Sequence, residues 1–199
     1  MQSERLHTTE GIPLVGPLLI TPRVFRDARG FFLESWNQHA FTEILEADGQ
    51  DSVPFVQDNH SRSFQGVLRG LHYQRSPHAQ GKLVRCVAGA IFDVAVDLRL
   101  HAPTFGQWAG VTLCATHQQQ LWIPAGFAHG FLTMSPQADV LYKTTDFWES
   151  SCEQSIRWDD PDLAIAWPLP LLAAAAPQLS EKDAAASFLV DLPPWALPS

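Results

Sequence analysis

The chain has 199 residues, of which 46% are apolar and 17% charged, and this composition excludes general disorder. With 13 basic and 21 acidic residues, the net charge is −8 and no basic block occurs, which argues against nucleic acid and anionic membranes as partners. A few local cations could still bind a small anionic ligand. We expect one domain over 1–199, with a core of about 5–185 and a tail over 186–199.

Targeting signals are not evident. No apolar run reaches the ~18 residues that would predict a membrane span, and the N-terminus lacks a basic region followed by a long apolar segment. The 3 cysteines, Cys86, Cys114 and Cys152, are widely spaced. We expect free thiols, no metal cluster and a cytoplasmic location.

In chain order, the first helix signal covers 37–49. Phe41, Ile44 and Leu45 fall on one side of this segment, and Gly49 follows its end. Strand signals dominate from about residue 12 to residue 145. Glycines and prolines interrupt these strands at short intervals, which is typical of an antiparallel sandwich or barrel.

The clearest strand pattern lies at 82–99, which we interpret as two strands around Ala88-Gly89. In the second strand, Phe92, Val94, Val96 and Leu98 share one face, while Ile91, Asp93, Ala95 and Asp97 share the other. Further strands are predicted at 107–115, 119–126 and 138–148. A short helix is expected from about Glu181, and the last residues, 191–199, are expected to be loose.

Polar residues within the apolar run 67–74 need an explanation. Arg69, His72 and, further on, Lys82 are predicted to be buried, and two buried cations are costly unless an anion lies between them. Arg69 and His72 differ in strand parity. A bulge or strand end near Gly70 is therefore required to aim both side chains inward.

Other polar positions support a site more weakly. Arg29 and Glu34 flank an aromatic pair, and taken alone this segment is better explained as an exposed turn followed by an edge strand than as part of a site. Gln57 and Asn59 share one strand face, where their amides could bind a base or sugar or simply satisfy their own turn. Tyr142 and Trp148 could be packing residues, or a proton donor and a stacking platform.

The segment 122–131 contains Pro124, Gly126 and His129, a Pro-x-Gly-x-x-His element found in cupin barrels. That histidine often binds a metal in cupins, which also need a His-x-His pair on an earlier strand. Here the earlier strand offers only His72, followed by Gln74. One imidazole with distant donors is a poor ligand set, so we expect no metal and no other cofactor.

Together, the segments DARGFFLESWN, FVQDNHSRSFQGVLRGLHYQ, QGKLVRCVAGAIFDVAVDLR, QLWIPAGFAHGF and YKTTDFW resemble the dTDP-4-dehydrorhamnose 3,5-epimerase family over about 5–185. The resemblance implies an all-β, cupin-type jelly roll with short helices in the N-terminal third and the C-terminal tail. It also implies a metal-independent isomerase and a homodimer that exchanges N-terminal arms. The substrate would be a dTDP-4-keto-6-deoxy sugar in dTDP-rhamnose synthesis.

The resemblance also implies roles for individual residues. His72 resembles the catalytic base, Tyr142 the acid, Asp183 the carboxylate that orients His72, and Lys82 the cation beside the keto oxygen. Trp148 stands where the family often has a stacking tyrosine. Further substrate-binding positions correspond to Arg29, Glu34, Gln57, Asp58, Asn59, Arg69, His129, Glu153 and Lys182, with Arg29 and Glu34 on the arm that can reach the partner.

These residue types suit proton transfer next to a ketone. The protons at C3 and C5 are both α to the C4 carbonyl, and their removal needs a nearby base and stabilisation of the enolate oxygen. Two alternatives remain open from the sequence: an epimerase that inverts only C3, and a cupin-like module that binds sugar nucleotides without turnover.

Overall fold

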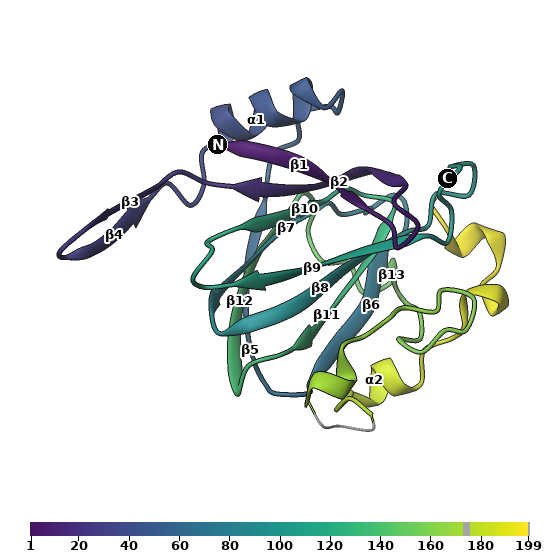
Figure 1. The fold of residues 1–199 in the computed structure, drawn as a ribbon. Helices are drawn as coiled ribbons and strands as arrows, with labels where there is room; N and C mark the ends of the chain where they lie inside the picture. Colours follow the sequence, from purple (N-terminus) through teal and green to yellow (C-terminus); the bar gives the residue numbers. More distant parts are fainter. Residues whose placement is uncertain (173–175, 199) are drawn as a thin grey trace.

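Two antiparallel sheets face each other in the computed structural model, which describes residues 1–172 and 176–198 (Figure 1). The six-stranded sheet has the order β1 (Gln2–His7), β2 (Pro13–Thr21), β10 (Gln120–Ile123), β7 (Lys82–Ala88), β12 (Gln137–Thr144) and β5 (Gln57–Phe64). The five-stranded sheet has the order β13 (Glu153–Ser155), β6 (Leu68–Gln74), β11 (Phe127–Thr133), β8 (Ala90–Asp97) and β9 (Trp108–Cys114). The predicted all-β architecture is confirmed.

The main core fills the space between the sheets. Because side chains alternate along a strand, Ile91 and Ala95 of β8 point into this space, while Val94 and Val96 point to the other side of the sheet. The split between the two faces is the one that the sequence pattern predicts. This core is completed by inward-facing apolar residues from β1, β2, β7, β9, β10, β11 and β12.

Each sheet is also covered on its outer face. Helix α1 (Gln38–Ala47) packs Phe41, Ile44 and Leu45 against the six-stranded sheet. It begins at Asn37, whose side chain accepts a hydrogen bond from the Ala40 N–H at 3.1 Å, and ends before Gly49, which has a φ of +79°. No helix within the described residues is both long and apolar enough to cross a membrane.

The C-terminal segment covers the outer face of the five-stranded sheet. It contains the short helix α2 (Glu181–Ala184), near its predicted start, and the 3-10 helices η1 (Leu169–Leu172), η2 (Leu189–Asp191) and η3 (Pro194–Ala196). The prediction that 191–199 is loose is wrong as far as residue 198, because Ala196 is 1% exposed and its carbonyl accepts a hydrogen bond from the Tyr73 hydroxyl at 3.1 Å. Residues 173–175, in the alanine run, and residue 199 lie outside the described residues.

Strand β6 contains the irregularity that the parity argument requires. His72 pairs with His129 and Arg69 pairs with Phe131, so two residues of β6 oppose one residue of β11. Both Arg69 and His72 therefore point toward the space between the sheets. Gly70 has a φ of +130°, and a Cβ there would lie 2.5 Å from the Gly130 Cα, so only glycine fits.

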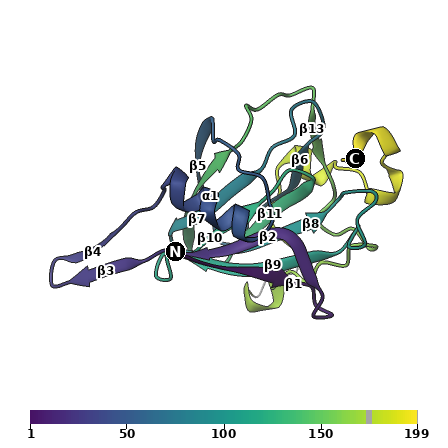
Figure 2. The ribbon, with the colours of Figure 1, turned by 90° about the horizontal axis from the view of Figure 1, so that it is seen from above.

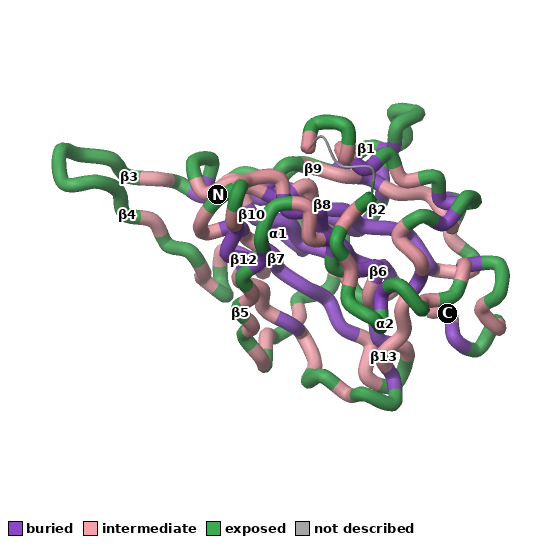
Figure 3. Tube along the Cα trace, turned by 90° about the horizontal axis from the view of Figure 1, so that it is seen from below, coloured by how far each residue is buried: buried purple, intermediate pink, exposed green. Residues whose placement is uncertain are grey.

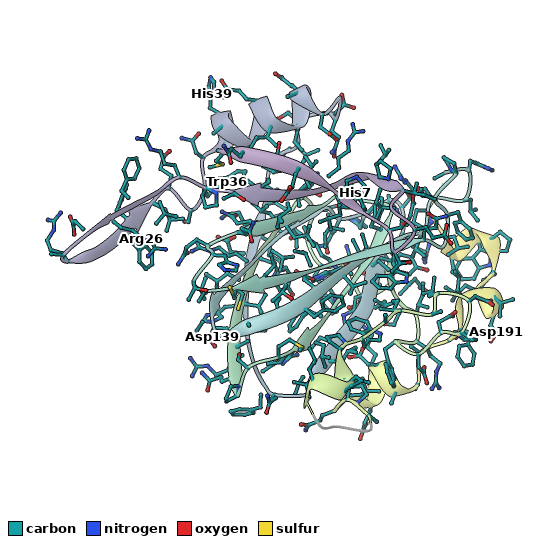
Figure 4. The ribbon with its side chains drawn as sticks, viewed as in Figure 1. His7, Arg26, Trp36, His39, Asp139 and Asp191 are labelled. Carbon is teal, nitrogen blue, oxygen red and sulfur yellow. The ribbon has the colours of Figure 1, made fainter. Side chains whose placement is uncertain are left out.

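A hairpin formed by β3 (Val24–Asp27) and β4 (Gly30–Leu33) projects away from both sheets (Figures 1 and 2). Figure 3 shows that it is exposed along most of its length. Its apolar side chains Phe25, Phe31 and Phe32 are 48%, 55% and 67% exposed. In Figure 4, Arg26 lies on this hairpin, and its guanidinium donates a hydrogen bond to the Thr116 carbonyl at 3.3 Å. The hairpin thus presents three exposed aromatic side chains close together in the sequence.

All three cysteines are free, as predicted. Cys86 and Cys152 are buried, and Cys114 is half-buried on β9. Burial raises the pKa of Cys86 to about 11, so this thiol stays protonated at neutral pH and acts as a small apolar core residue.

Candidate active site

A cavity of about 370 Å³ opens between the two sheets at the end where their inward-facing residues become polar. Tyr142 reaches it from β12 of the six-stranded sheet, and His72 reaches it from β6 of the five-stranded sheet. The phenol and the imidazole therefore approach one space from facing walls. The cavity is lined by Gln57, Asn59, His72, Tyr73, Gln74, Gln80, Lys82, Tyr142, Thr144, Trp148 and Glu153.

His72 binds a buried carboxylate. Its Nε2 lies 2.5 Å from Oδ1 of Asp183, which is 3% exposed and lies on α2. Burial raises the pKa of Asp183, but the hydrogen bond and charge of His72 and the Ser180 hydroxyl outweigh it, so the net shift is downward. An ionised Asp183 accepts a hydrogen bond from the Nε2–H group of His72, so the lone pair of the ring is on Nδ1.

A second histidine–carboxylate pair lies beside the first. His129, on β11, is 8% exposed, and its Nε2 lies 2.5 Å from Oδ1 of the fully buried Asp93. Burial lowers the pKa of His129, and the charges of Lys82 and His72 add to this effect, whereas Asp93 opposes it. His129 is thus a neutral, buried donor at neutral pH, and it lies behind the cavity wall.

Lys82 extends from β7 across the space between the sheets. Its Nζ donates a hydrogen bond to the His72 carbonyl at 3.1 Å, and the residue is 9% exposed. Burial lowers the pKa of Lys82 to about 8, against the opposing charges of Glu153 and Asp93. An ammonium held in so little water interacts strongly with any negative charge that forms in the cavity.

Tyr142 keeps its proton at neutral pH. Burial raises the pKa of its phenol, and nearby Arg69 lowers it by a smaller amount. Arg69 itself is exposed, which corrects the prediction that it is buried. The bulge in β6 aims Arg69 inward, where its guanidinium donates to Ser63 Oγ at 2.9 Å and to the Arg62 carbonyl at 3.3 Å, and Arg69 is not among the residues that line the cavity.

Glu153 and Lys182 form an ion pair of 2.6 Å at the edge of the cavity. Burial raises the pKa of Glu153, but Lys182 and the Trp148 side chain outweigh it and lower the pKa overall. Trp148 is 57% exposed and lines the cavity from a loop, because β12 ends at Thr144. The predicted strand over 138–148 is therefore too long by its last four residues.

Three predicted site residues lie elsewhere. Asp58 faces the outer side of the six-stranded sheet, where it binds Lys143 at 2.8 Å, because its neighbours on β5, Gln57 and Asn59, occupy the inward positions. Arg29 lies at the tip of the hairpin and pairs with Asp27 at 2.6 Å. Glu34 follows β4 and accepts a hydrogen bond from Asn37.

Sequence reasoning missed two buried residues at the site. Asp93 is an inward-facing carboxylate in an apolar strand. Its place on the same strand face as Ile91 and Ala95 is a sequence signal for a buried carboxylate. Gln74 lines the cavity at 4% exposure, and no sequence signal distinguishes it from an ordinary strand end. In the described part of the chain, no group of three or more His, Cys, Asp or Glu is placed to hold a metal ion.

Comparison with known proteins shows that the chain is similar to sugar-nucleotide epimerases in sequence and fold. A dTDP-4-dehydrorhamnose 3,5-epimerase of Pseudomonas aeruginosa is 60% identical over 166 residues, covering 83% of this chain and 87% of its own. A crystal structure of a dTDP-6-deoxy-D-glucose-3,5-epimerase from Legionella pneumophila, in complex with dTDP-4-keto-L-rhamnose, is 47% identical with a TM-score of 0.88. The superposition covers 99% of this chain and 98% of that one.

A more distant neighbour performs a narrower reaction. It is a 3′-monoepimerase from Streptomyces bikiniensis, described in complex with dTDP, with 33% identity and a TM-score of 0.84 over 94% of this chain and 92% of its own. The fold is thus a cupin-type jelly roll, as the resemblance predicts. The sequence model of the dTDP-4-dehydrorhamnose 3,5-epimerase family matches residues 12–191, and the chain belongs to this family.

Proposed function

We propose that the protein inverts C3 and C5 of dTDP-4-keto-6-deoxyglucose in dTDP-L-rhamnose synthesis. Family membership and the names of the relatives support the reaction and the substrate class. The observation that carries the proposal is the placement of His72 and Tyr142 on facing walls of one cavity. Inversion at a carbon needs proton removal on one side and proton delivery on the other, and this placement supplies both.

His72 is the proposed base. Asp183 holds the Nε2 proton, so Nδ1 carries the lone pair that takes the proton from C3 or C5. Asp183 also stabilises the imidazolium that forms. A neutral imidazole is a suitable general base for proton abstraction.

Lys82 is the proposed partner of the enolate oxygen at C4. Proton removal moves negative charge onto that oxygen, and the Lys82 ammonium gains most of its interaction energy at this stage, when the charge forms. Tyr142 then donates its phenolic proton to the opposite face of the carbanion. Its raised pKa keeps that proton available at neutral pH.

The remaining cavity residues are proposed to hold the nucleotide. Trp148 presents an exposed indole on which thymine can stack. Arg69, whose charge acts on the Tyr142 phenol, has a guanidinium suited to a diphosphate oxygen. Gln57, Asn59, His129, Glu153 and Lys182 supply further polar contacts or position the residues that do.

Proton NMR in deuterium oxide tests the reaction. Incubation of the enzyme with the 4-keto sugar nucleotide should place deuterium at both C3 and C5. Label at C3 alone would show a monoepimerase instead, the reaction named for the Streptomyces bikiniensis neighbour. Binding without any label would show a sugar-nucleotide-binding module.

We also propose a homodimer in which each hairpin serves the site of the other subunit. The exposed Phe25, Phe31 and Phe32 are available to pack against a partner, and Arg29 lies at the turn of the β3–β4 hairpin, which projects away from both sheets (Figure 2). Mixing inactive Arg29→Ala and His72→Ala subunits tests the exchange. Heterodimers would contain one intact site and regain activity, whereas hairpins that serve their own site would give no recovery.

A further inference from the structure

The loop 145–149 carries the two exposed aromatic side chains beside the cavity, Phe147 and Trp148. It follows the end of β12 and pairs with no strand among the described residues. Instead, side chains of glutamines bind the backbone of each of its last four residues. These glutamines come from β5, from β6 and from the turn that precedes β7.

Gln74 makes the central contacts. Its Nε2 donates to the Phe147 carbonyl at 3.1 Å and to the His78 carbonyl at 2.6 Å, while its Oε1 accepts from the Glu149 N–H at 2.7 Å. Both amide protons and the oxygen are therefore occupied. Although Gln74 lines the cavity, its side chain is committed to the loop rather than to a ligand.

Two further glutamines complete the contacts. Gln80 is 9% exposed, and its Nε2 donates to the Asp146 carbonyl at 2.6 Å. Gln57 accepts from the Trp148 N–H at 3.2 Å. All three side chains are neutral, unlike the His78 imidazole, whose Nδ1 also lies 3.1 Å from Oδ2 of Asp146 in the loop.

Gln74 also lies two residues after His72 on the same strand. One strand thus carries the proposed base and fixes the loop that carries the proposed stacking platform. We propose that Gln74, assisted by Gln80, is a positioning residue that sets the place of Trp148 relative to His72 and so determines affinity for the nucleotide. This inference rests on the proposed function, since it assumes that Trp148 contacts the base.

A double-mutant cycle tests the inference, with dTDP as the probe and calorimetric titration of the full-length protein as the measurement. Gln74→Met keeps the length of the side chain but removes all three hydrogen bonds. We expect it to weaken dTDP binding about tenfold. In a Trp148→Ala background the same change should alter binding by less than about twofold, because the residue through which Gln74 acts is gone.

Kinetics supply a second readout. If Gln74 only positions the loop, the variant should raise KM and leave kcat close to that of the wild type. Gln65→Met is the matched control, because Gln65 is exposed and donates to the Met134 carbonyl at 2.9 Å, outside the site. This control should bind dTDP as the wild type does.

Several results would overturn the inference. Equal losses of dTDP affinity in both backgrounds would show that Gln74 acts without Trp148, and unchanged affinity would show that the loop does not depend on it. If Gln74→Met fails to fold, Gln80→Met replaces it in the double-mutant cycle, and its dTDP affinity is compared in the wild-type and Trp148→Ala backgrounds in the same way. A wild-type protein that does not bind dTDP would refute the proposed function as well, which separates the two failures.

Discussion

His72 lies directly opposite His129 across the β6–β11 pairing, and each imidazole binds its own carboxylate at 2.5 Å. Opposed residues of an antiparallel pair project from the same face, so both pairs lie in the space between the sheets. Positive charge on one ring disfavours it on the other, and the deeper His129 is the one whose pKa is lowered. His72 lines the cavity and His129 does not, so His72 is the proposed base.

Replacement of Asp183 by asparagine tests this assignment. The amide group of the Asp183→Asn variant can donate to Nε2, which shifts the imidazole proton to Nδ1 and blocks the proposed base. We expect kcat to fall by ~10²-fold or more, as measured by formation of epimerised product. Asp191→Asn, on an exposed residue in the same segment, should retain full activity.

Tyr142→Phe removes the proposed acid without changing the shape of the ring. His72 can still remove a proton and return deuterium to the same face, so exchange into the substrate should continue in deuterium oxide. Formation of the inverted product should fall by ~10²-fold or more. Product formation at the wild-type rate would show that another group delivers the proton.

The pKa of Lys82 predicts a pH dependence of activity. Lys82 loses its charge as the pH rises through about 8, so kcat should decline above that pH if the ammonium stabilises the enolate. Rate measurements between pH 6.5 and 9.5 check this. Product is observed directly by NMR, so that the pH dependence of a coupling enzyme does not enter the result. A rate that stays constant up to pH 9.5 would remove Lys82 from the proposed role.

Lys82→Met should make the protein more stable at pH 7. The pKa of Lys82 is 10.5 in the unfolded chain and about 8 in the folded one, so the unfolded state binds more protons between these values and wild-type stability rises with pH there. The variant does not bury a charged ammonium, so its free energy of unfolding should exceed that of the wild type by up to about 3 kcal/mol at pH 7. In urea unfolding, the difference in unfolding free energy between the variant and the wild type should become smaller as the pH approaches 10.5.

Asp160 anchors the C-terminal segment that carries Asp183. It is 2% exposed and accepts hydrogen bonds from the backbone N–H groups of Asp162, Leu163 and Leu189 at 2.9, 3.1 and 2.6 Å. Asp160→Asn turns an amide group toward one of these donors and should cost about 2–3 kcal/mol of unfolding free energy. Asp159→Asn, which breaks only a partly exposed pair with Arg157, is the control and should cost less than about 1 kcal/mol.

Much of the fold could be predicted because it follows from strand parity and turn residues. The two faces of β8 and the helix α1 both emerge from local patterns, and the bulge at Gly70 follows from two polar residues of opposite parity. The family prediction is also confirmed. These features depend on neighbouring residues, which the sequence shows directly.

Other features depend on contacts between distant segments and could not be predicted. Arg69 lies in an apolar run, yet its side chain is exposed and donates to Ser63 on β5, a contact that strand periodicity does not reveal. The tail packs because Ala196 meets Tyr73, a contact over 123 residues. Gln74 is committed to the loop 145–149 by bonds that only the folded chain brings together.

Every strand of both sheets is complete by Ser155, yet the carboxylate that binds His72 arrives 28 positions later, on α2. A premature stop codon between these points would still encode the whole sandwich but would omit the proton-orienting group. The His72–Asp183 pair is thus completed late in translation, and a chain that ends before residue 183 lacks its carboxylate.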